Sequence, residues 1–546
     1  MRKTGGRILV DCLLAQGVKR AFGVPGESYL AVLDALYDTP EIQLIGNRNE
    51  GGAAFMAAAH GQLTGQPGIC FVTRGPGATN ASIGVHTAMQ GSTPMILFVG
   101  QVATDMKGRE AFQEIDYKAY FGTVAKWVVE IDDVDRIPEI LARAFTTAVS
   151  GRPGPVVIAL PEDVLTSTSK AVAGPRIKTS EAAPTPTALE GIRKTLTAAK
   201  RPVVVIGGTG WNAEGREDLR KFVEGNHLPV ASAFRFQDIL DNTSSSYIGD
   251  AGLGKTPALK AAIDRADVIF ALNIRFGENT TDGYTIFPVP RIGKSLIHSH
   301  ASDRELGKIY QADMPVHAGP NALCGMLAEL NLEGNWQDWA TKTRKAYIDS
   351  MALPIRDNGV DMGAVVQHLQ NVLPKDVILT NGAGNFAIWH NKFFQYGDAA
   401  RLLAPQSGAM GYGLPAAIAA KAEHPDRLVV CIAGDGDFQM NMQELGAAMQ
   451  AEAQPVVLVV NNGTYGTIRM HQERDFPRRT SFTDIQNPDF TAIAKAYGFY
   501  AEKVTETTQF AAAFQRAVQS NTGGLLELVV DPENLTPKQT MSQIRG

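Results

Sequence analysis

The chain alternates short, continuously apolar runs with longer stretches in which apolar residues recur every three or four positions. The short runs are typical of buried strands, and the longer stretches are typical of helices that pack one face on a sheet. Up to about residue 170, this pattern predicts strands at 18–22, 42–45, 68–72, 94–99 and 155–159, and helices at 8–16, 30–37 and 51–63. Strands and helices that alternate in this way form parallel sheets covered by helices on both faces.

The alternation resumes after two breaks, so we predict an α/β protein of three doubly wound domains. Residues 170–186 are polar and rich in Ala, Pro and Thr, which indicates a linker, and a second junction lies near 354–359. The predicted domains are 1–170, 187–335 and 355–546. Their later strands are expected at 202–206, 268–272 and 295–298 in the middle domain, and at 377–379, 428–432, 456–460 and 525–530 in the third.

Polar residues follow two neighbouring strands predicted in the third domain. GDG at 434–436 follows the first, NNG at 461–463 follows the second, and a helical stretch at 441–453 connects them. The two strands should be parallel neighbours whose carboxyl ends open on one crevice. Asp435 and Asn462 then offer oxygen ligands to a hard cation, and the glycines let backbone approach a phosphate. This predicts a Mg²⁺–diphosphate site; an ordinary βαβ unit with turn-forming Gly and Asn is the alternative.

Composition limits the class of protein. The 546 residues are 44% hydrophobic and 20% charged, with a net charge of −5, so electrostatics gives no reason to expect nucleic-acid or membrane binding. The four cysteines are far apart and contain no CxxC pair, which fits buried thiols in a reducing compartment. No apolar stretch approaches the roughly 18 residues of a membrane span. We therefore expect a cytoplasmic protein.

GDG followed by NN, with residues 437–460 between them, resembles the motif of thiamine-diphosphate-dependent enzymes. The ending NNGTYG at 461–466 is a common form of that motif. The resemblance covers essentially the whole chain and is closest to acetolactate synthase large subunits, in a family that includes benzoylformate and pyruvate decarboxylases. It implies an N-terminal pyrimidine-binding domain, a Rossmann-like middle domain and a C-terminal diphosphate-binding domain. The thiamine-diphosphate-binding fold would thus occur twice.

The resemblance implies cofactor contacts along the third domain. PQSGAMGYGLPA at 405–416 matches the segment in which the Gly408 carbonyl receives the cofactor's 4′-amino group and Met410 supports its bent shape, and NGAGNFAIW at 381–389 matches the first diphosphate loop. Asp437 stands where Ser, Ala or Gly is more usual, and an acid there would repel diphosphate unless it is turned away or hydrogen-bonded. The cofactor-binding residues implied are Gly384, Asn385, Gly408, Met410, Gly434, Asp435, Gly436, Asp437, Asn462, Thr464, Tyr465 and Gly466, with Asp435, Asn462 and Thr464 as Mg²⁺ ligands.

Three residues of the first domain are the catalytic candidates. Glu50, in NRNEGGAAFMA, matches the glutamate that activates the cofactor through its aminopyrimidine ring, although it could also simply favour a helix dipole. Gln113, in AFQEID, matches an acetolactate synthase residue expected near the reacting carbon, and a place on a surface helix is its alternative. Glu27 occupies the place where pyruvate decarboxylases carry a catalytic aspartate.

The resemblance implies decarboxylation of a 2-oxo acid, followed by addition of the resulting enamine to a second carbonyl. Release of an aldehyde, with Glu27 as proton donor, is the alternative. Two positions depart from acetolactate synthase: Asn279 replaces the arginine that holds the second substrate's carboxylate, and His471 replaces a pocket tryptophan. Without the arginine, a second 2-oxo acid loses a charge-assisted contact.

The resemblance also implies an obligate homodimer or a dimer of dimers, in which Glu50 of one subunit reaches the partner's cofactor. FAD is an accessory cofactor of many acetolactate synthases. We expect that FAD is not bound here, because residues 250–259 replace the family's GMHGT-type segment. Binding of FAD stays the alternative, since Gly207–Gly210 near the start of the middle domain fits the family pattern. GDAGLGKT at 249–256 has the letters of a P-loop, which makes a nucleotide hydrolase a remote alternative. The residues before it are too polar for the buried strand that a P-loop requires.

Overall fold

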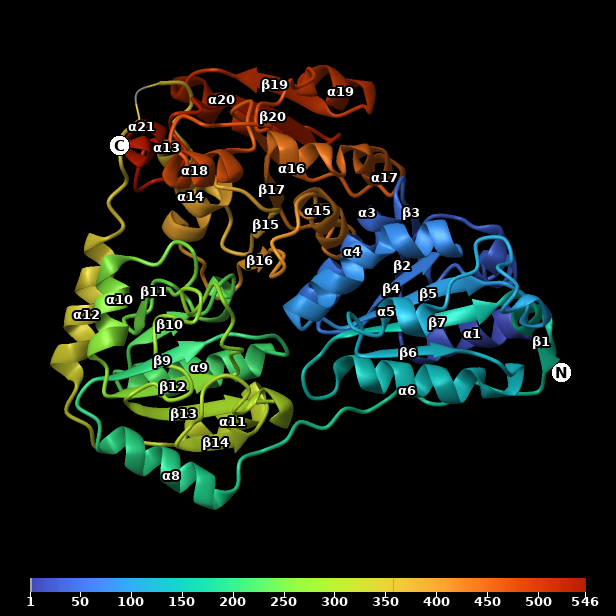
Figure 1. The fold of residues 1–546 in the computed structure, drawn as a ribbon, viewed down its shortest axis with the longest axis horizontal. Coiled ribbons are helices and arrows are strands. Elements are labelled where there is room, and N and C mark those ends of the chain that lie inside the picture. The colour runs from blue at the N-terminus through green and yellow to red at the C-terminus, as the bar shows by residue number, and fades with distance from the viewer. Residues whose placement is uncertain (1, 357) are drawn as a thin grey trace.

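The computed structural model describes residues 2–356 and 358–546. These residues form three α/β domains, each built on a six-stranded sheet, and the domains lie at the corners of a triangle in Figure 1. The strands of each sheet are parallel. The prediction of three doubly wound α/β domains is confirmed.

The first and third domains share one strand order. Counted along the chain within each sheet, both orders are 2-1-3-4-6-5, so the same fold occurs twice. In the first domain the strands are β2 Arg20–Gly23, β3 Gln43–Gly46, β4 Gly68–Val72, β5 Met95–Gln101, β6 Trp127–Glu130 and β7 Pro155–Pro161. In the third they are β15 Ile378–Asn381, β16 Arg401–Leu403, β17 Val429–Gly434, β18 Val456–Asn461, β19 Tyr500–Val504 and β20 Gly524–Val529.

The middle domain has the order 3-2-1-4-5-6, which is that of a Rossmann sheet. Its strands are β9 Pro202–Ile206, β10 Val230–Ser232, β11 Tyr247–Asp250, β12 Val268–Leu272, β13 Ser295–His300 and β14 Met314–His317. Its helices are α8 Pro186–Thr197, α9 Ala213–Gly225, α10 Pro257–Arg265, α11 Pro320–Leu327 and α12 Gln337–Asp349.

Helices cover both faces of the other two sheets. In the first domain the main ones are α1 Gly5–Ala15, α2 Leu30–Tyr37, α3 Glu50–Thr64, α4 Gly75–Gly91 and α6 Ile137–Val149. In the third they are α13 Met362–Val372, α14 Phe386–Phe393, α15 Gly413–Glu423, α16 Asp435–Gln439, α17 Leu445–Gln450, α18 Gly466–Asp475, α19 Phe490–Ala496, α20 Thr507–Gln519 and α21 Met541–Arg545.

The predicted helix at 441–453 is wrong in its bounds. The helical segment begins at Asp435, directly after β17, and is divided into α16, a 3₁₀ turn at Met442–Glu444 and α17. Helix α4, which the apolar pattern did not indicate, begins at Gly75 shortly after β4 and carries Pro76 in its first turn, where proline is tolerated. The predicted parallel pairing of the strands on either side of the GDG segment, β17 and β18, is present.

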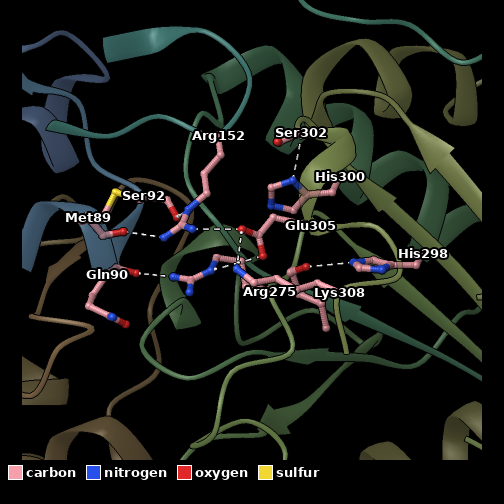
Figure 2. A network of polar contacts seen from close by, with 11 residues as sticks. Met89, Gln90, Ser92, Arg152, Arg275, His298, His300, Ser302, Glu305 and Lys308 are labelled. Carbon is pink, nitrogen blue, oxygen red and sulfur yellow. Dashed lines mark hydrogen bonds and ion pairs between the residues drawn. The ribbon is translucent and has the colours of Figure 1, made fainter. Parts of the chain in front are cut away.

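The domains are joined by contacts of two kinds. One hydrophobic cluster runs from the alanine-rich α3 and from α4 into α15 and α17 of the third domain. The first and middle domains meet instead through a polar network around Glu305 (Figure 2), which accepts from Arg152 at 3.0 Å and lies 3.7 Å from the Arg275 Nε atom. Burial raises the pKa of Glu305, but the charges of Arg152, Arg275 and Lys308 hold it below its usual range.

The four cysteines are buried and free, as their spacing predicts. Within residues 2–356 and 358–546, no helix has both the length and the apolar composition needed to cross a bilayer.

Candidate functional site

A cavity of about 230 Å³ opens at the carboxyl ends of β15, β17 and β18. β15 and β17 flank the point where the strand order reverses, which is where open α/β sheets bind their ligands. All twelve cofactor-binding residues predicted from the sequence line this cavity. Their roles toward a cofactor stay predictions, but the fold brings them together from four separate segments of the third domain.

Asp435 is placed by the end of β17 and is 3% exposed. Its Oδ1 accepts from the Gly436 N–H at 2.9 Å, and its Oδ2 accepts from the Gly463 N–H at 2.8 Å and from Asn487 at 2.7 Å. Burial raises the pKa of Asp435 above its usual value, and these hydrogen bonds offset only part of that increase. Since two carboxylate oxygens offer about four lone pairs, one is left for a cation.

Asn487 is a site residue that the sequence did not indicate. It lies in the chain between α18 and α19, and it donates to Asp435 Oδ2 and to Asn461 Oδ1, at 2.7 and 2.8 Å. Gln439 donates to the Asn487 side-chain oxygen at 2.9 Å, which fixes the orientation of its amide. An isolated asparagine outside any motif carries no signal of this role.

Asn462 and Thr464 supply further oxygens to the cavity. The Thr464 N–H donates to Asn462 Oδ1 at 3.1 Å, in a turn in which Gly463 has a φ of 66°. A carboxylate, an amide oxygen and a threonine oxygen form the hard donor set that Mg²⁺ prefers. No cluster of three His, Cys, Asp or Glu residues suited to a metal occurs in the described chain. A cation here would therefore depend on neutral oxygens beside Asp435.

Two loops also contribute to the wall, and we call them the cofactor loops: residues 382–385 after β15, and residues 405–411 before α15. The first carries Gly384 and Asn385, and Thr467 donates to Asn385 Oδ1 at 2.9 Å. The second carries Gly408 and Met410. Gly408 has a φ of 67°, a conformation that favours glycine.

The shape of the cavity explains two of its glycines. A Cβ at Gly384 would lie 2.6 Å from the Phe386 ring, and one at Gly434 would lie 2.8 Å from it. Both glycines thus let the wall close around the cavity. The residues present fit a diphosphate bound with Mg²⁺. Glycines in the wall leave the backbone accessible to a phosphate, and the oxygen donors described above suit the cation.

Asp437, the unusual acid after GDG, is buried in the cavity wall and hydrogen-bonded to backbone. It is 3% exposed, and its Oδ1 accepts from the N–H groups of Ala383 and Gly411, at 3.0 and 2.8 Å. Burial raises the pKa of Asp437 to about 7, although these hydrogen bonds and the charge of Arg235 act in the opposite direction. The sequence left open how an acid is accommodated here, and these contacts explain it.

The three catalytic candidates lie in the first domain and none of them lines the cavity within one chain. Glu50 begins α3, where Asn49 caps the helix, and its Oε2 accepts from Asn80 Nδ2 at 2.9 Å. Glu27 is exposed at the start of the 3₁₀ turn Glu27–Tyr29. Gln113 is half-buried with a φ of 65°, and its carbonyl accepts from the Gly75 N–H at 3.0 Å. The surface-helix alternative for Gln113 is therefore wrong.

The two positions that depart from acetolactate synthase lie apart from each other. Asn279 lines a separate cavity of about 490 Å³ bordered by all three domains, together with Arg275 and Gln406. His471 is exposed on α18 and lies outside the wall of the 230 Å³ cavity.

Lys255, the lysine of the P-loop-like string, is occupied within the middle domain. It is 7% exposed, lies 2.8 Å from Asp282 Oδ1 and donates to the Thr280 carbonyl at 3.1 Å. A short strand, β11, runs into the start of the string, contrary to the expectation from the polar residues before it. The lysine is nevertheless committed to its own ion pair, which argues against a phosphate-binding P-loop.

Glu444 is a second residue that the sequence did not indicate. Its carboxylate is fully buried and accepts from Asn47 at 2.9 Å and from the N–H groups of Arg48 and Asn49, at 3.1 and 3.0 Å. It therefore ties the third domain to the loop that leads into Glu50. Burial raises the pKa of Glu444 to about 6, and the hydrogen bonds offset only part of that increase.

We predict that Glu444→Gln changes the pH dependence of stability. The Glu444 carboxyl has a pKa of about 6 in the folded protein and about 4.3 in the unfolded chain. The folded protein therefore binds the proton more tightly, so protonation adds to the free energy of unfolding of the wild type. This contribution is lost as the pH rises from about 4.3 through about 6. A glutamine stays neutral, so the variant does not lose this contribution. Between about pH 4.5 and about pH 7, the free energy of unfolding of the variant should therefore rise by about 2 kcal/mol relative to that of the wild type, and its Tm should rise accordingly. Thermal melts across this range test it, with Glu452→Gln at an exposed position as control. Parallel curves for Glu444→Gln and the wild type would contradict it.

Comparison with known proteins agrees with this architecture. Residues 3–120 match the N-terminal TPP binding domain of thiamine pyrophosphate enzymes, residues 189–330 match their central domain, and residues 382–528 match their C-terminal TPP binding domain. The chain belongs to the thiamine pyrophosphate enzyme family.

Its relatives within the family include large subunits of acetolactate synthase. The chain is 30% identical to the isozyme 2 large subunit of Escherichia coli K12, over 98% of this chain and 97% of the relative. It is 32% identical to the isozyme 3 large subunit of the same organism (100% and 97%) and 32% identical to the large subunit of Corynebacterium glutamicum (95% and 85%). The protein is thus a thiamine-diphosphate-dependent enzyme similar to acetolactate synthase.

Proposed function

We propose that this enzyme uses thiamine diphosphate and Mg²⁺ to decarboxylate a 2-oxo acid and to join the remaining acyl carbon to a second carbonyl compound. The observation that carries the proposal is the 230 Å³ cavity, whose wall contains every cofactor-binding residue implied by the family motifs. The full-length similarity to acetolactate synthases supports ligation as the outcome.

In this proposal the residues that bind the cofactor lie in the third domain, and the residues that act on protons and substrate lie in the first. Asp435, Asn462 and Thr464 would hold Mg²⁺, and the cofactor loops would enclose the diphosphate and the ring next to it. When bound, the cofactor supplies the electron sink for cleavage of the carbon–carbon bond. Glu50 would hold and transfer a proton at its carboxylate when the cofactor is bound, while Gln113 and Glu27 would act on the substrate side.

This division requires a second copy of the chain. Glu50 faces Asn80 in the first domain and does not line its own chain's cavity. A homodimer, alone or paired into a dimer of dimers, places Glu50 of one subunit at the cavity of the other. The site is therefore incomplete in a single chain.

Release of an aldehyde is the second candidate outcome, and Asn279 favours it. A neutral amide at this position cannot hold the carboxylate of a second 2-oxo acid by a charge-assisted, bidentate contact. The exposed Glu27 carboxyl could then serve as the proton donor for release.

Turnover of pyruvate tests the proposal. The purified protein is supplied with thiamine diphosphate and Mg²⁺, and CO₂ and the organic products are followed. Acetolactate supports ligation, whereas acetaldehyde supports the second candidate. Cofactor binding that depends on Asp435 without pyruvate turnover would direct the search to other 2-oxo acids, and no cofactor binding would overturn the proposal.

We further propose that FAD is not required. The segment that replaces the family's GMHGT-type segment is held by contacts within the chain, because Lys255 forms an ion pair with Asp282 and Lys538 donates to the Lys255 carbonyl at 3.1 Å. The purified protein should therefore show no visible flavin absorption, and added FAD should leave turnover unchanged. A bound flavin, or activity that increases with added FAD, would contradict this prediction.

A further inference from the structure

The same acid and the same base make hydrogen bonds to both cofactor loops. Asp437 accepts from the Ala383 N–H in the first loop and from the Gly411 N–H in the second, at 3.0 and 2.8 Å. Arg235, in the chain after β10 of the middle domain, donates to the Gly382 carbonyl in the first loop at 3.1 Å and to the Pro405 carbonyl in the second. Each loop thus donates one backbone N–H to Asp437 and accepts one hydrogen bond from Arg235.

Both side chains are buried, and their charges are close enough to interact. Asp437 is 3% exposed and Arg235 is 4% exposed. The charge of each favours ionisation of the other, through space and without a direct salt bridge. Buried charges of opposite sign compensate one another, so removing one leaves the other uncompensated. This arrangement accounts for an acid directly after GDG, because its Oδ1 accepts from two backbone N–H groups of the cofactor loops and the charge of Arg235 favours its ionised form.

The backbone at Arg235 also indicates a constrained position. Its φ of 61° lies in the left-handed region, which costs free energy for a residue with a long side chain. This backbone conformation places the guanidinium between the two cofactor loops, where its planar shape can donate to two carbonyl oxygens in fixed directions. A lysine could keep the charge but not this geometry.

We propose that Arg235 and Asp437 are positioning residues that hold the two cofactor loops in their binding geometry and so set the affinity for thiamine diphosphate with Mg²⁺. The inference rests on the proposed function, because it takes the cavity as the cofactor site. Since Arg235 belongs to the middle domain, cofactor affinity depends on the contact between the middle and third domains.

Cofactor titration of the full-length protein tests the proposal. Calorimetry gives the Kd of thiamine diphosphate at saturating Mg²⁺, and melts of the cofactor-free protein give its Tm. Arg235→Met should raise the Kd by about 10- to 100-fold, as for removal of groups that orient ligands. Arg235→Lys should restore part of the affinity, and Asp437→Asn should lose less because its amide oxygen still accepts from the two N–H groups. The double variant should lose less affinity than the two single losses combined, because the two side chains act on the same loops.

Gln237→Ala is the matched control. Gln237 is 1% exposed and donates to the Asn391 carbonyl at 3.4 Å across the same domain contact, but it does not line the 230 Å³ cavity. Its Kd should equal that of the wild type even if its Tm falls.

The possible outcomes separate the two proposals. Wild-type Kd values in Arg235→Lys and Asp437→Asn would overturn the positioning role, and so would Kd losses that add without coupling in the double variant. Failure of the wild type itself to bind would instead overturn the proposed function. If Arg235→Met does not fold, the lysine and asparagine variants carry the same comparison.

Discussion

Replacing Glu50 by glutamine should reduce turnover by about 10²- to 10⁴-fold, the usual contribution of a positioned proton-transfer group. Glutamine keeps the size of the side chain and can still accept a hydrogen bond from Asn80, but it cannot exchange a proton. The Kd for thiamine diphosphate with Mg²⁺ should change little, because the proposed ligands of the diphosphate and the cation lie in the third domain. Steady-state kinetics with calorimetric cofactor binding measures both effects.

Glu41→Gln, at an exposed position of the same domain, is the control and should leave turnover unchanged. A Glu50→Gln enzyme with wild-type turnover would show that Glu50 only favours the α3 dipole, the plainer role that its position also allows.

The same variant can reveal whether sites are shared between subunits. A heterodimer of Glu50→Gln and Asp435→Asn chains has one site with both residues intact, if each site takes Glu50 from one subunit and Asp435 from the other. Random pairing should then restore about one quarter of wild-type activity, since half of the dimers are mixed and each has one working site. Co-expression with two affinity tags yields the mixture. Recovery of no activity would place Glu50 and Asp435 of one chain in the same site.

Replacing Asp435 by asparagine should strongly weaken Mg²⁺-dependent cofactor binding. The variant removes the one charged ligand of the proposed cation site, and the neutral oxygens of Asn462 and Thr464 cannot replace that charge. We expect the affinity for thiamine diphosphate to fall by at least about 100-fold, the upper end of the losses measured for groups that only support metal ligands. Titration with and without a chelator measures the effect, and chelation should weaken binding to the wild type in the same way.

Two further variants show whether the loss of affinity in Asp435→Asn comes from the loss of a cation ligand. Asn487→Ala removes the hydrogen bonds that Asn487 makes with Asp435, Asn461 and Gln439 but leaves the Asp435 carboxylate in place, so it should cost less, about tenfold. Asp475→Asn, an exposed carboxylate on α18, should cost nothing. Equal affinity in Asp435→Asn and the wild type would exclude Asp435 as the cation ligand.

Much of the fold is predictable because its determinants are local. The apolar runs at 68–72 and 202–206 coincide with β4 and β9, since a strand buried on both faces must be continuously apolar. The helix at 441–453 is misplaced because glycines and acids after β17 resemble a turn, whereas helix α16 begins there. Strand order is not local either, so the matching orders of the first and third sheets emerge only from the structure.

The sequence by itself determined the segments that border the cavity, because short motifs such as GDG and NNGTYG combine glycines with oxygen donors at fixed positions after strands. The tertiary structure decided which other residues support them. Asn487 reaches Asp435 from 52 positions along the chain, and Glu444 reaches Asn47 from 397. Arg235 reaches Pro405 across a domain boundary. Such partners are chosen by the packing of whole domains, so no local pattern records them.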